Sequence, residues 1–501
     1  MLAEWVIAAK PRAMRRTLAY LALVALAVVP GSCRRPPAGA ASVVVIGGEP
    51  KLRDPALGAL STPDAVLVGN VAQGLVRFDY AGNIVGGLAE RWNVSDDGVS
   101  YIFRLAATKW SDGRPVTAQQ VAKLLKRAVG PRSKDQLKDA LGAIDDIVAM
   151  TDRVIEIRLT APRPNLLALL AQPDLAILRG GQGTGPFSVA PNPEGRSGLR
   201  LTSEVLSSGE DVAQKEEVVL SGATAQDAVE RFVGGKADLV LGGTFAELAF
   251  AQRVKLPRGS LRFDPVSGLF GLVPVHSGGD LDEPDVRRLL NQAVNRDVFI
   301  GALGVPGLVP RATVLEPGLD GIPAPVAPAW LSMPPDARRA ALAAESNRLF
   351  GKTQKPVIHI FLPEAPGADL LLQELGRDWG ALGFAVERAA SPEAADFRLV
   401  DAVAPSSSPA WFVRQFRCEV TPVCDPEADA LMDAARQSQV PAQRYALLVQ
   451  AAAKIDDGQL FLPITAPVRW SLVSGRIQGF AGNRYAVHTL TDLERKPGAG
   501  D

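Results

Sequence analysis

The spacing of apolar positions between residues 92 and 105 predicts a β-hairpin. Tyr101, Phe103 and Leu105 occupy every second position, which is the period of a strand with one buried face. A shorter apolar segment, at 92–94, precedes them, and Asp97-Gly98 lies between the two segments. Because this dipeptide favours the turn between paired strands, the region is interpreted as one hairpin.

A helix start follows the hairpin. The Thr117 hydroxyl can accept a hydrogen bond from an early backbone N–H group, and Gln120 stands where its side chain can reach back, as in a capping box. Behind this cap, apolar residues fall on one helical face; they are Val121, Leu124, Leu125 and Ala128. The sequence therefore predicts an amphipathic helix just after Thr117.

The order of these elements resembles that of the extracytoplasmic solute-binding proteins of ABC importers, the large family that takes up peptides, nickel complexes and some sugars. Five segments carry the resemblance in the family's order: GLVRFD, GLAERWNVSDDGVSYIFRL, KWSDGRPVTAQQV, GTGPF and VRRLLNQAVNRD. The resemblance implies an α/β fold of the two-lobe, periplasmic-binding-protein type II class, in the large cluster with an extra subdomain. A hinge would let the two lobes close on a ligand, without chemistry and without a cofactor.

The chain of 501 residues is too long for one compact core. The resemblance and the apolar runs together predict its division. The predicted parts are a signal peptide with a lipobox-like end (1–33), a tether (34–41), the first lobe (42–80 and 180–265), a subdomain packed on the first lobe (81–179), the second lobe (266–474) and a segment returning to the first lobe (475–501).

Other apolar runs predict further elements. One unit of strand, helix and strand favours a mainly parallel sheet in the second lobe. The predicted strands are 42–46, 154–159, 175–178, 218–220, 238–241, 357–362, 384–387, 397–400 and 460–465, and the predicted helices are 64–73, 165–171, 225–233, 285–298, 369–382, 426–439 and 441–456.

The first residues indicate export. Arg15-Arg16 precede an apolar run at 18–29, which is too short to span a bilayer but fits the core of a signal peptide. The run ends in Gly31-Ser32-Cys33, which resembles a bacterial lipobox and implies lipidation of Cys33. A plain cleaved signal peptide is the alternative, and either Met1 or Met14 is the start. The expected location is periplasmic or on the cell surface, with a lipid anchor as the only membrane contact.

The net charge and the absence of catalytic motifs bear on the class of function. Lys+Arg and Asp+Glu both number 54, so net charge gives no argument for a nucleic acid partner. The three histidines are far apart, and no nucleophile motif of the G-x-S-x-G type occurs. We therefore expect no enzyme, no metal and no cofactor. An exported hydrolase and a sensory or scaffold lipoprotein of the same fold are the alternatives to an importer component.

The cysteine count agrees with export. If Cys33 carries lipid, Cys418 and Cys424 remain as an even pair. An oxidising compartment favours a disulfide between them. Two reduced cysteines, or a bridge to another chain, are the alternatives.

The resemblance also directs attention to one candidate ligand loop. In peptide-binding relatives a loop similar to D-x-x-D-P supplies an aspartate to the peptide's α-ammonium group. The matching loop here is the PSSSP stretch at 405–409, which keeps the proline and lacks both acids. Asp401, four residues before this loop, is the candidate to replace the missing acid. The candidate ligand-binding residues are Asp401, Ser406, Ser407, Trp411, Phe412, Arg414 and Arg417.

Each of these candidates has a structural alternative. The aromatic residues offer apolar surface to a ligand or pack in the core, and the arginines face an anion or point into solvent. We expect a peptide ligand without the usual ammonium contact, with a sugar derivative or an anionic metabolite as the alternative. The expected partners are this solute and the ABC permease subunits, and the protein is expected to be a monomer.

Overall fold

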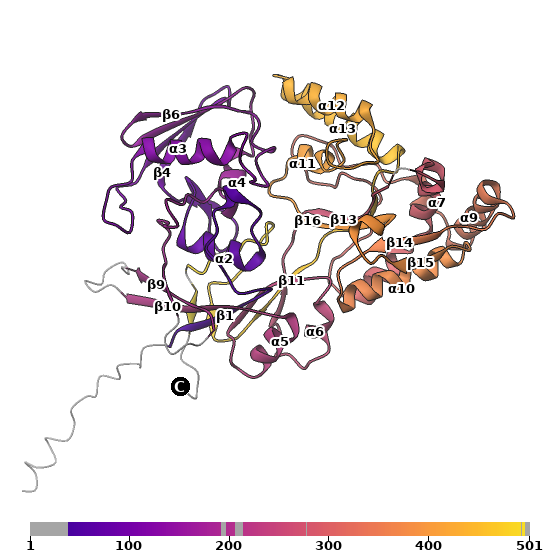
Figure 1. The fold of residues 1–501 in the computed structure, drawn as a ribbon, viewed down its shortest axis with the longest axis horizontal. Helices are drawn as coiled ribbons and strands as arrows, with labels where there is room; N and C mark the ends of the chain where they lie inside the picture. Colours follow the sequence, from indigo (N-terminus) through magenta and orange to yellow (C-terminus); the bar gives the residue numbers. More distant parts are fainter. Residues whose placement is uncertain (1–38, 192–196, 206–213, 277, 492, 496–501) are drawn as a thin grey trace, which may run out of the picture. The chain divides into compact units, whose positions relative to one another are not determined.

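A computed structural model describes residues 39–191, 197–205, 214–276, 278–491 and 493–495 (Figure 1). The predicted signal peptide, Cys33 and most of the tether lie outside these residues. The hairpin is confirmed: β4 (Ala89–Val94) pairs antiparallel with β5 (Ser100–Leu105). The helix after it, α3 (Ala118–Val129), begins with the predicted capping box of Thr117 and Gln120.

A seven-stranded sheet runs in the order β12-β18-β11-β1-β10-β9-β8. β1 pairs in parallel with β10 and β11, and the outer pairings are antiparallel. Val43 and Val45 point to one buried face of β1 and Val44 to the other, so both faces are covered. The strands are β1 (Ala41–Ile46), β8 (Ser188–Pro191), β9 (Leu199–Val205), β10 (Gln214–Ala223), β11 (Leu239–Thr244), β12 (Leu261–Phe263) and β18 (Arg469–Val473).

A five-stranded sheet runs in the order β15-β14-β16-β13-β17. Its strands are β13 (Gly268–Pro274), β14 (Val357–Phe361), β15 (Ala385–Arg388), β16 (Phe397–Val403) and β17 (Leu462–Thr465). β14 is parallel to β15 and β16, but β13 is antiparallel to β16 and β17. Four of the five strands therefore run in the same direction, as the prediction of a mainly parallel sheet requires, and β13 alone runs against them. β13 brings the chain in from β12 and β17 leads it out to β18, so these neighbours run in opposite directions.

A four-stranded antiparallel sheet, β4-β5-β7-β6, makes a separate core with α3. It adds β6 (Ile144–Thr151) and β7 (Val154–Leu159), and the short pair β2 (Val76–Phe78) and β3 (Ile84–Gly86) lies beside it in sequence. Trp110 and Phe103 are buried in this core, which agrees with a structural role for the WSDG segment. Figure 1 shows α3 lying across this sheet.

The remaining helices cover the sheets or connect them. α12 and α13 lie side by side (Figure 1), each opened by a proline as predicted. Among the described residues, the α-helices other than α3 are α2 (Thr62–Val71), α4 (Leu166–Leu170), α5 (Ala225–Val233), α6 (Leu248–Gln252), α7 (Pro284–Ala293), α8 (Arg296–Leu303), α9 (Pro335–Phe350), α10 (Pro366–Gly380), α11 (Pro409–Arg414), α12 (Pro426–Gln437) and α13 (Pro441–Asp457). Within the described parts of the chain, no helix has the length and apolar character needed to cross a bilayer.

The single helix predicted over 285–298 is broken into α7 and α8. The break frees backbone groups that find partners nearby. The guanidinium group of Arg296 donates to the carbonyls of Asn291 (3.0 Å) and Val294 (3.2 Å). The N–H group of Asn295 donates to a carboxylate oxygen of Asp378 at 2.6 Å. These contacts replace the intrahelical hydrogen bonds that a continuous helix would make.

The strand predicted over 175–178 is also wrong. A 3-10 helix covers Pro173–Leu175, with Pro173 at its first position. In the buried stretch that follows, the Ala176 N–H group donates to the Pro173 carbonyl and the Ile177 N–H group to the Gln73 carbonyl, each at 3.1 Å, and neither bond belongs to a strand ladder. Buried apolar runs and buried strands share the same pattern, so periodicity alone could not separate them.

Candidate functional site

A cavity of about 200 Å³ lies between two parts of the chain that are distant in sequence. One side comes from residues 136–169, within the predicted subdomain, and the other from residues 406–448, within the predicted second lobe. Apolar side chains on its wall include Leu169, Trp411 and Leu448. Its charged lining is dominated by five arginines, Arg163, Arg414, Arg417, Arg436 and Arg444, against the two acids Asp139 and Glu419.

Residues 405–409, here called the serine loop, connect the two sides of this cavity. Ser406 is buried, lines the cavity and accepts a hydrogen bond from the Asn165 amide at 3.2 Å. The carbonyl of Pro405 accepts from the Gln172 side chain at 2.9 Å. Ser407 does not line the cavity, and its carbonyl accepts from the backbone N–H of Asp320 at 2.9 Å. The unpredicted Ser408 lines it instead.

The two candidate aromatic residues have different positions. α11 turns Trp411 toward the cavity, where it is half-buried, and turns Phe412 into the core. Phe412 is fully buried beside Val413 and Phe416. The two rings meet edge to face with 5.0 Å between their centroids. Of the pair, Trp411 is therefore the one placed to touch a ligand.

Both candidate arginines line the cavity, but their surroundings differ. Arg417 forms ion pairs with Asp433 (2.9 Å) and Glu419 (3.4 Å). The Asp433 contact is the main reason that the pKa of Arg417 is raised. Arg414 donates to the backbone carbonyl of Asp139, and burial lowers the pKa of this arginine. Arg414 thus carries the less neutralised charge.

Asp401 does not line the cavity. It sits on β16, and its side chain, 15% exposed, forms an ion pair with Arg469 of β18 at 2.7 Å. Arg469 also donates to the Asp401 carbonyl at 3.1 Å. Burial raises the pKa of Asp401, and Arg469 opposes that rise. A contact from Asp401 to a ligand ammonium group stays a prediction. The ion pair with Arg469 does not favour this contact, because it already occupies the carboxylate.

Three arginines of the cavity wall were not predicted from the sequence. Arg163 follows a strand, while Arg436 and Arg444 lie on charged helices whose pattern indicates only solvent-facing surface. No motif joins them, and they come together only in the fold. The pKa of Arg163 is lowered to about 10, first by burial and then by the neighbouring positive charges of Arg444, Arg436 and Arg414.

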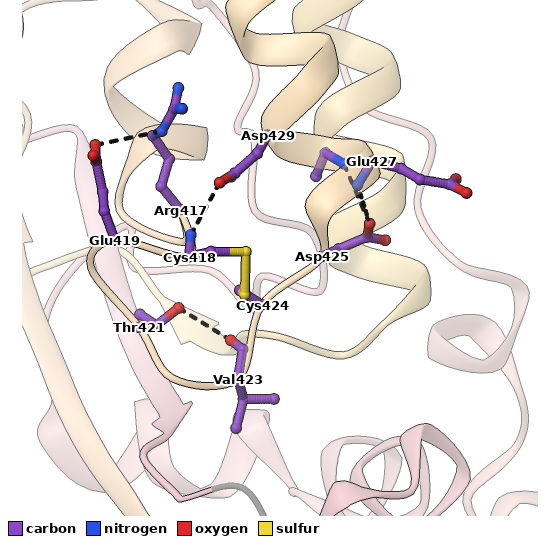
Figure 2. Close-up of a disulfide and its surroundings, with 10 residues drawn as sticks. Arg417, Cys418, Glu419, Thr421, Val423, Cys424, Asp425, Glu427 and Asp429 are labelled. Atoms are coloured by element: carbon purple, nitrogen blue, oxygen red, sulfur yellow. Dashed lines mark hydrogen bonds and ion pairs between the residues drawn. A yellow bond between two sulfur atoms is a disulfide. The ribbon is translucent and has the colours of Figure 1, made fainter.

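A disulfide joins Cys418 and Cys424 (Figure 2), and the sequence neighbours of Cys418, Arg417 and Glu419, line the cavity. The Cys418 N–H group donates to the Asp429 carboxylate at 3.2 Å, which fixes the loop against α12. Asp425, next to the second cysteine, caps the same helix by accepting from the Glu427 N–H at 2.7 Å. The bridge therefore holds the segment between Arg417, on the cavity wall, and the start of α12.

Opening this bridge is expected to lower the free energy of unfolding by about 2 kcal/mol, because a small closed loop restricts the unfolded chain. Chemical denaturation of the Cys418→Ser, Cys424→Ser double variant measures the effect. Intact mass of the native mature protein, with and without reductant, shows the pairing itself. Two free thiols in the unreduced protein would contradict the prediction.

Known proteins similar to this chain identify its family. The family model for bacterial extracellular solute-binding proteins, family 5 (middle part), matches residues 83–412. The probable di/tripeptide-binding protein 5 of Pseudomonas aeruginosa is 25% identical over 476 residues, which cover 82% of this chain and 87% of that protein. Three shorter matches, to binding proteins from Escherichia coli, Salmonella typhimurium and Lactococcus lactis, span 24%, 55% and 22% of those proteins.

Solved structures show the same fold. The Haemophilus influenzae OppA complex with the peptide RPPGFSPFR has a TM-score of 0.76 at 18% identity, over 91% of this chain and 99% of that one. The AgaA protein of A. tumefaciens R10, in complex with agropinic acid, has a TM-score of 0.72 at 17% identity, over 92% and 99%. These relatives are binding proteins, and the family is extracytoplasmic. The chain has the expected two-lobe fold and belongs to family 5 of the bacterial extracellular solute-binding proteins.

Proposed function

We propose that this protein is the extracytoplasmic binding component of an ABC importer. It captures a small solute, a short peptide by preference, between two closing lobes and delivers it to the permease subunits. It acts as a monomer, without a cofactor and without turning the solute over. The observation that carries the proposal is the cavity that residues 136–169, of the predicted subdomain, and residues 406–448, of the predicted second lobe, line together.

The contacts across the cavity support opening and closing. They are hydrogen bonds such as those from Asn165 to Ser406 and from Gln439 to the Thr160 carbonyl (2.8 Å). The core of the predicted subdomain and the core beneath α11–α13 are separate clusters. Parting them breaks polar contacts that water can replace, so little apolar area is exposed. The chain passes between the two large sheets after β12 and again after β17, and these crossings make the proposed hinge.

The cavity favours a short ligand. Its volume of about 200 Å³ is below the roughly 300–1,000 Å³ of sites that hold drug-sized ligands. The P. aeruginosa relative is named for di- and tripeptides, which supports the same size class. Because the serine loop at 405–409 has no carboxylate, and Asp401 is held by Arg469, the usual ammonium contact is expected to be absent.

Calorimetry with a tripeptide library tests this proposal. We expect the free library and its N-acetylated version to bind with similar affinity, since no carboxylate awaits the ammonium group. Peptides should emerge intact from incubation with the protein, which separates a binding protein from a hydrolase. Failure of both libraries to bind would remove the peptide assignment. If acetylation abolished binding and Asp401→Asn did the same, an ammonium site would exist after all.

The anchoring at Cys33 is a further part of the proposal, and this residue lies outside the described residues. Its basis is the apolar run that ends in Gly31-Ser32-Cys33. Lipid chains on Cys33 would hold the protein at the membrane through a tether of roughly eight residues. Cys33→Ala should move the exported protein from the membrane fraction to the soluble fraction. A wild-type protein that is soluble, free of lipid and cleaved at another residue would contradict this.

A further inference from the structure

Four of the cavity arginines differ from Arg417 in their partners. Among described residues, no carboxylate forms an ion pair with Arg163, Arg414, Arg436 or Arg444, whereas Arg417 is paired with Asp433. Their hydrogen bonds go to backbone carbonyls. Arg163 donates to Pro162 (2.8 Å) and to Arg436 (3.2 Å), Arg444 to Pro162 (2.9 Å), Arg436 to Gly142 (3.2 Å), and Arg414 to Asp139. We call these four residues the arginine cluster.

The arginine cluster has positive charges and hydrogen-bond donors without matching acceptors in the described part of the chain. A guanidinium group has five N–H donors, and each of these four uses one or two of them. Arg163 and Arg444 are each only 8% exposed, so water screens their charges poorly. The like charges repel one another, and Asp139 and Glu419 offset only part of this charge. An oxyanion among the four groups would fill the free donors and neutralise the repulsion, as guanidinium groups do in bidentate pairs with carboxylate or phosphate.

We propose that the arginine cluster binds an anionic group of the imported solute, of the carboxylate or phosphate type. This deepens the proposed function and rests on it only in taking the cavity as the ligand site. It also agrees with the acid-free loop at 405–409: the solute is fixed by its negative end and not by an ammonium group.

The placement of the arginine cluster couples the anion to closure. Arg163 belongs to the segment before α4, while Arg414, Arg436 and Arg444 belong to α11, α12 and α13. Closing the cleft brings Arg163 toward the other three, which raises their mutual repulsion. An anion bound between Arg163 and the other three arginines attracts all of them, so the net interaction across the cavity becomes favourable. The loaded protein therefore closes more readily than the empty one.

Calorimetry with matched probes and variants tests the proposal. The probes are the tripeptide library, its C-terminally amidated version, citrate and inorganic phosphate. We expect amidation to weaken binding at least ten-fold. Arg163→Gln and Arg444→Gln should weaken the free library at least ten-fold and leave the amidated library unchanged, because only the anion contact is lost. Arg158→Gln is the control, since Arg158 pairs with Glu156 on an exposed strand face.

The outcomes separate this proposal from the proposed function. Equal binding of free and amidated peptides would overturn the anion site and leave the peptide importer standing. Arginine-dependent binding of citrate or phosphate without any peptide binding would support the anion site and remove the peptide assignment. If no anionic probe bound at millimolar concentration, the anion site would be overturned. If Arg163→Gln does not fold, Arg436→Gln, on the exposed side of α12, replaces it. Variants that lower the melting temperature but leave every affinity unchanged would show that these arginines only stabilise the fold. That result would also overturn the proposed anion site.

Discussion

Replacing Arg296 with methionine is expected to lower the free energy of unfolding by about 3 kcal/mol. Arg296 is 2% exposed and joins the start of α8 to two other segments. Its Nε donates to the carbonyls of Arg311 (2.8 Å) and Pro463 (2.9 Å). Burial lowers its pKa to about 9, which leaves it charged at neutral pH. Methionine fills a similar volume but leaves these buried carbonyls without donors.

Chemical denaturation measures this effect through the midpoint and slope of the transition. Arg339→Met is the matched control, because Arg339 is exposed on α9 and pairs with the exposed Asp336. Exposed pairs of this kind contribute between 0 and about 1 kcal/mol. A loss for Arg296→Met within about 0.5 kcal/mol of the control would show that water replaces the guanidinium group at the break between α7 and α8.

Asp401→Asn is expected to destabilise the protein by about 3 kcal/mol and to leave ligand affinity nearly unchanged. The substitution removes the negative partner of Arg469, whose side chain is 17% exposed, so a charge is left poorly compensated. This pair bridges β16 of the five-stranded sheet and β18 of the seven-stranded sheet. Ligand affinity should hardly change, because Asp401 does not line the cavity.

A double-mutant cycle with Arg469→Gln isolates the pair. We expect the double variant to be about as stable as either single variant, since each single change already breaks the interaction. Calorimetry on Asp401→Asn with the free tripeptide library supplies the second readout. A stable Asp401→Asn variant that no longer binds free peptides would show that Asp401 serves the ligand and not the junction between sheets.

Local signals in the sequence determined much of the fold. The capping box at Thr117 and the hairpin at Asp97-Gly98 rest on contacts between residues that are close in sequence, and both are present. The β14–α10–β15 unit and the proline-opened helices α12 and α13 were predicted for the same reason. α9 was not predicted, because its buried residues are few: Leu342, Ser346 and Phe350.

Tertiary structure decided the features that depend on distant partners. The break between α7 and α8 needs Asp378, which lies 83 positions beyond Asn295. The direction of β13 depends on how the chain enters and leaves its sheet, which no local period encodes.

The candidate site divides in the same way. The sequence located the serine loop and Arg414, since the resemblance pointed to that loop. It gave no sign of Arg163, whose hydrogen bond to the carbonyl of Arg436 spans 273 positions. An arginine on a polar helix looks the same in sequence whether it faces solvent or a cavity. Only the packing of α12 and α13 opposite residues 136–169 brings the arginine cluster together, because like charges gather in a fold only when the surrounding contacts hold them there.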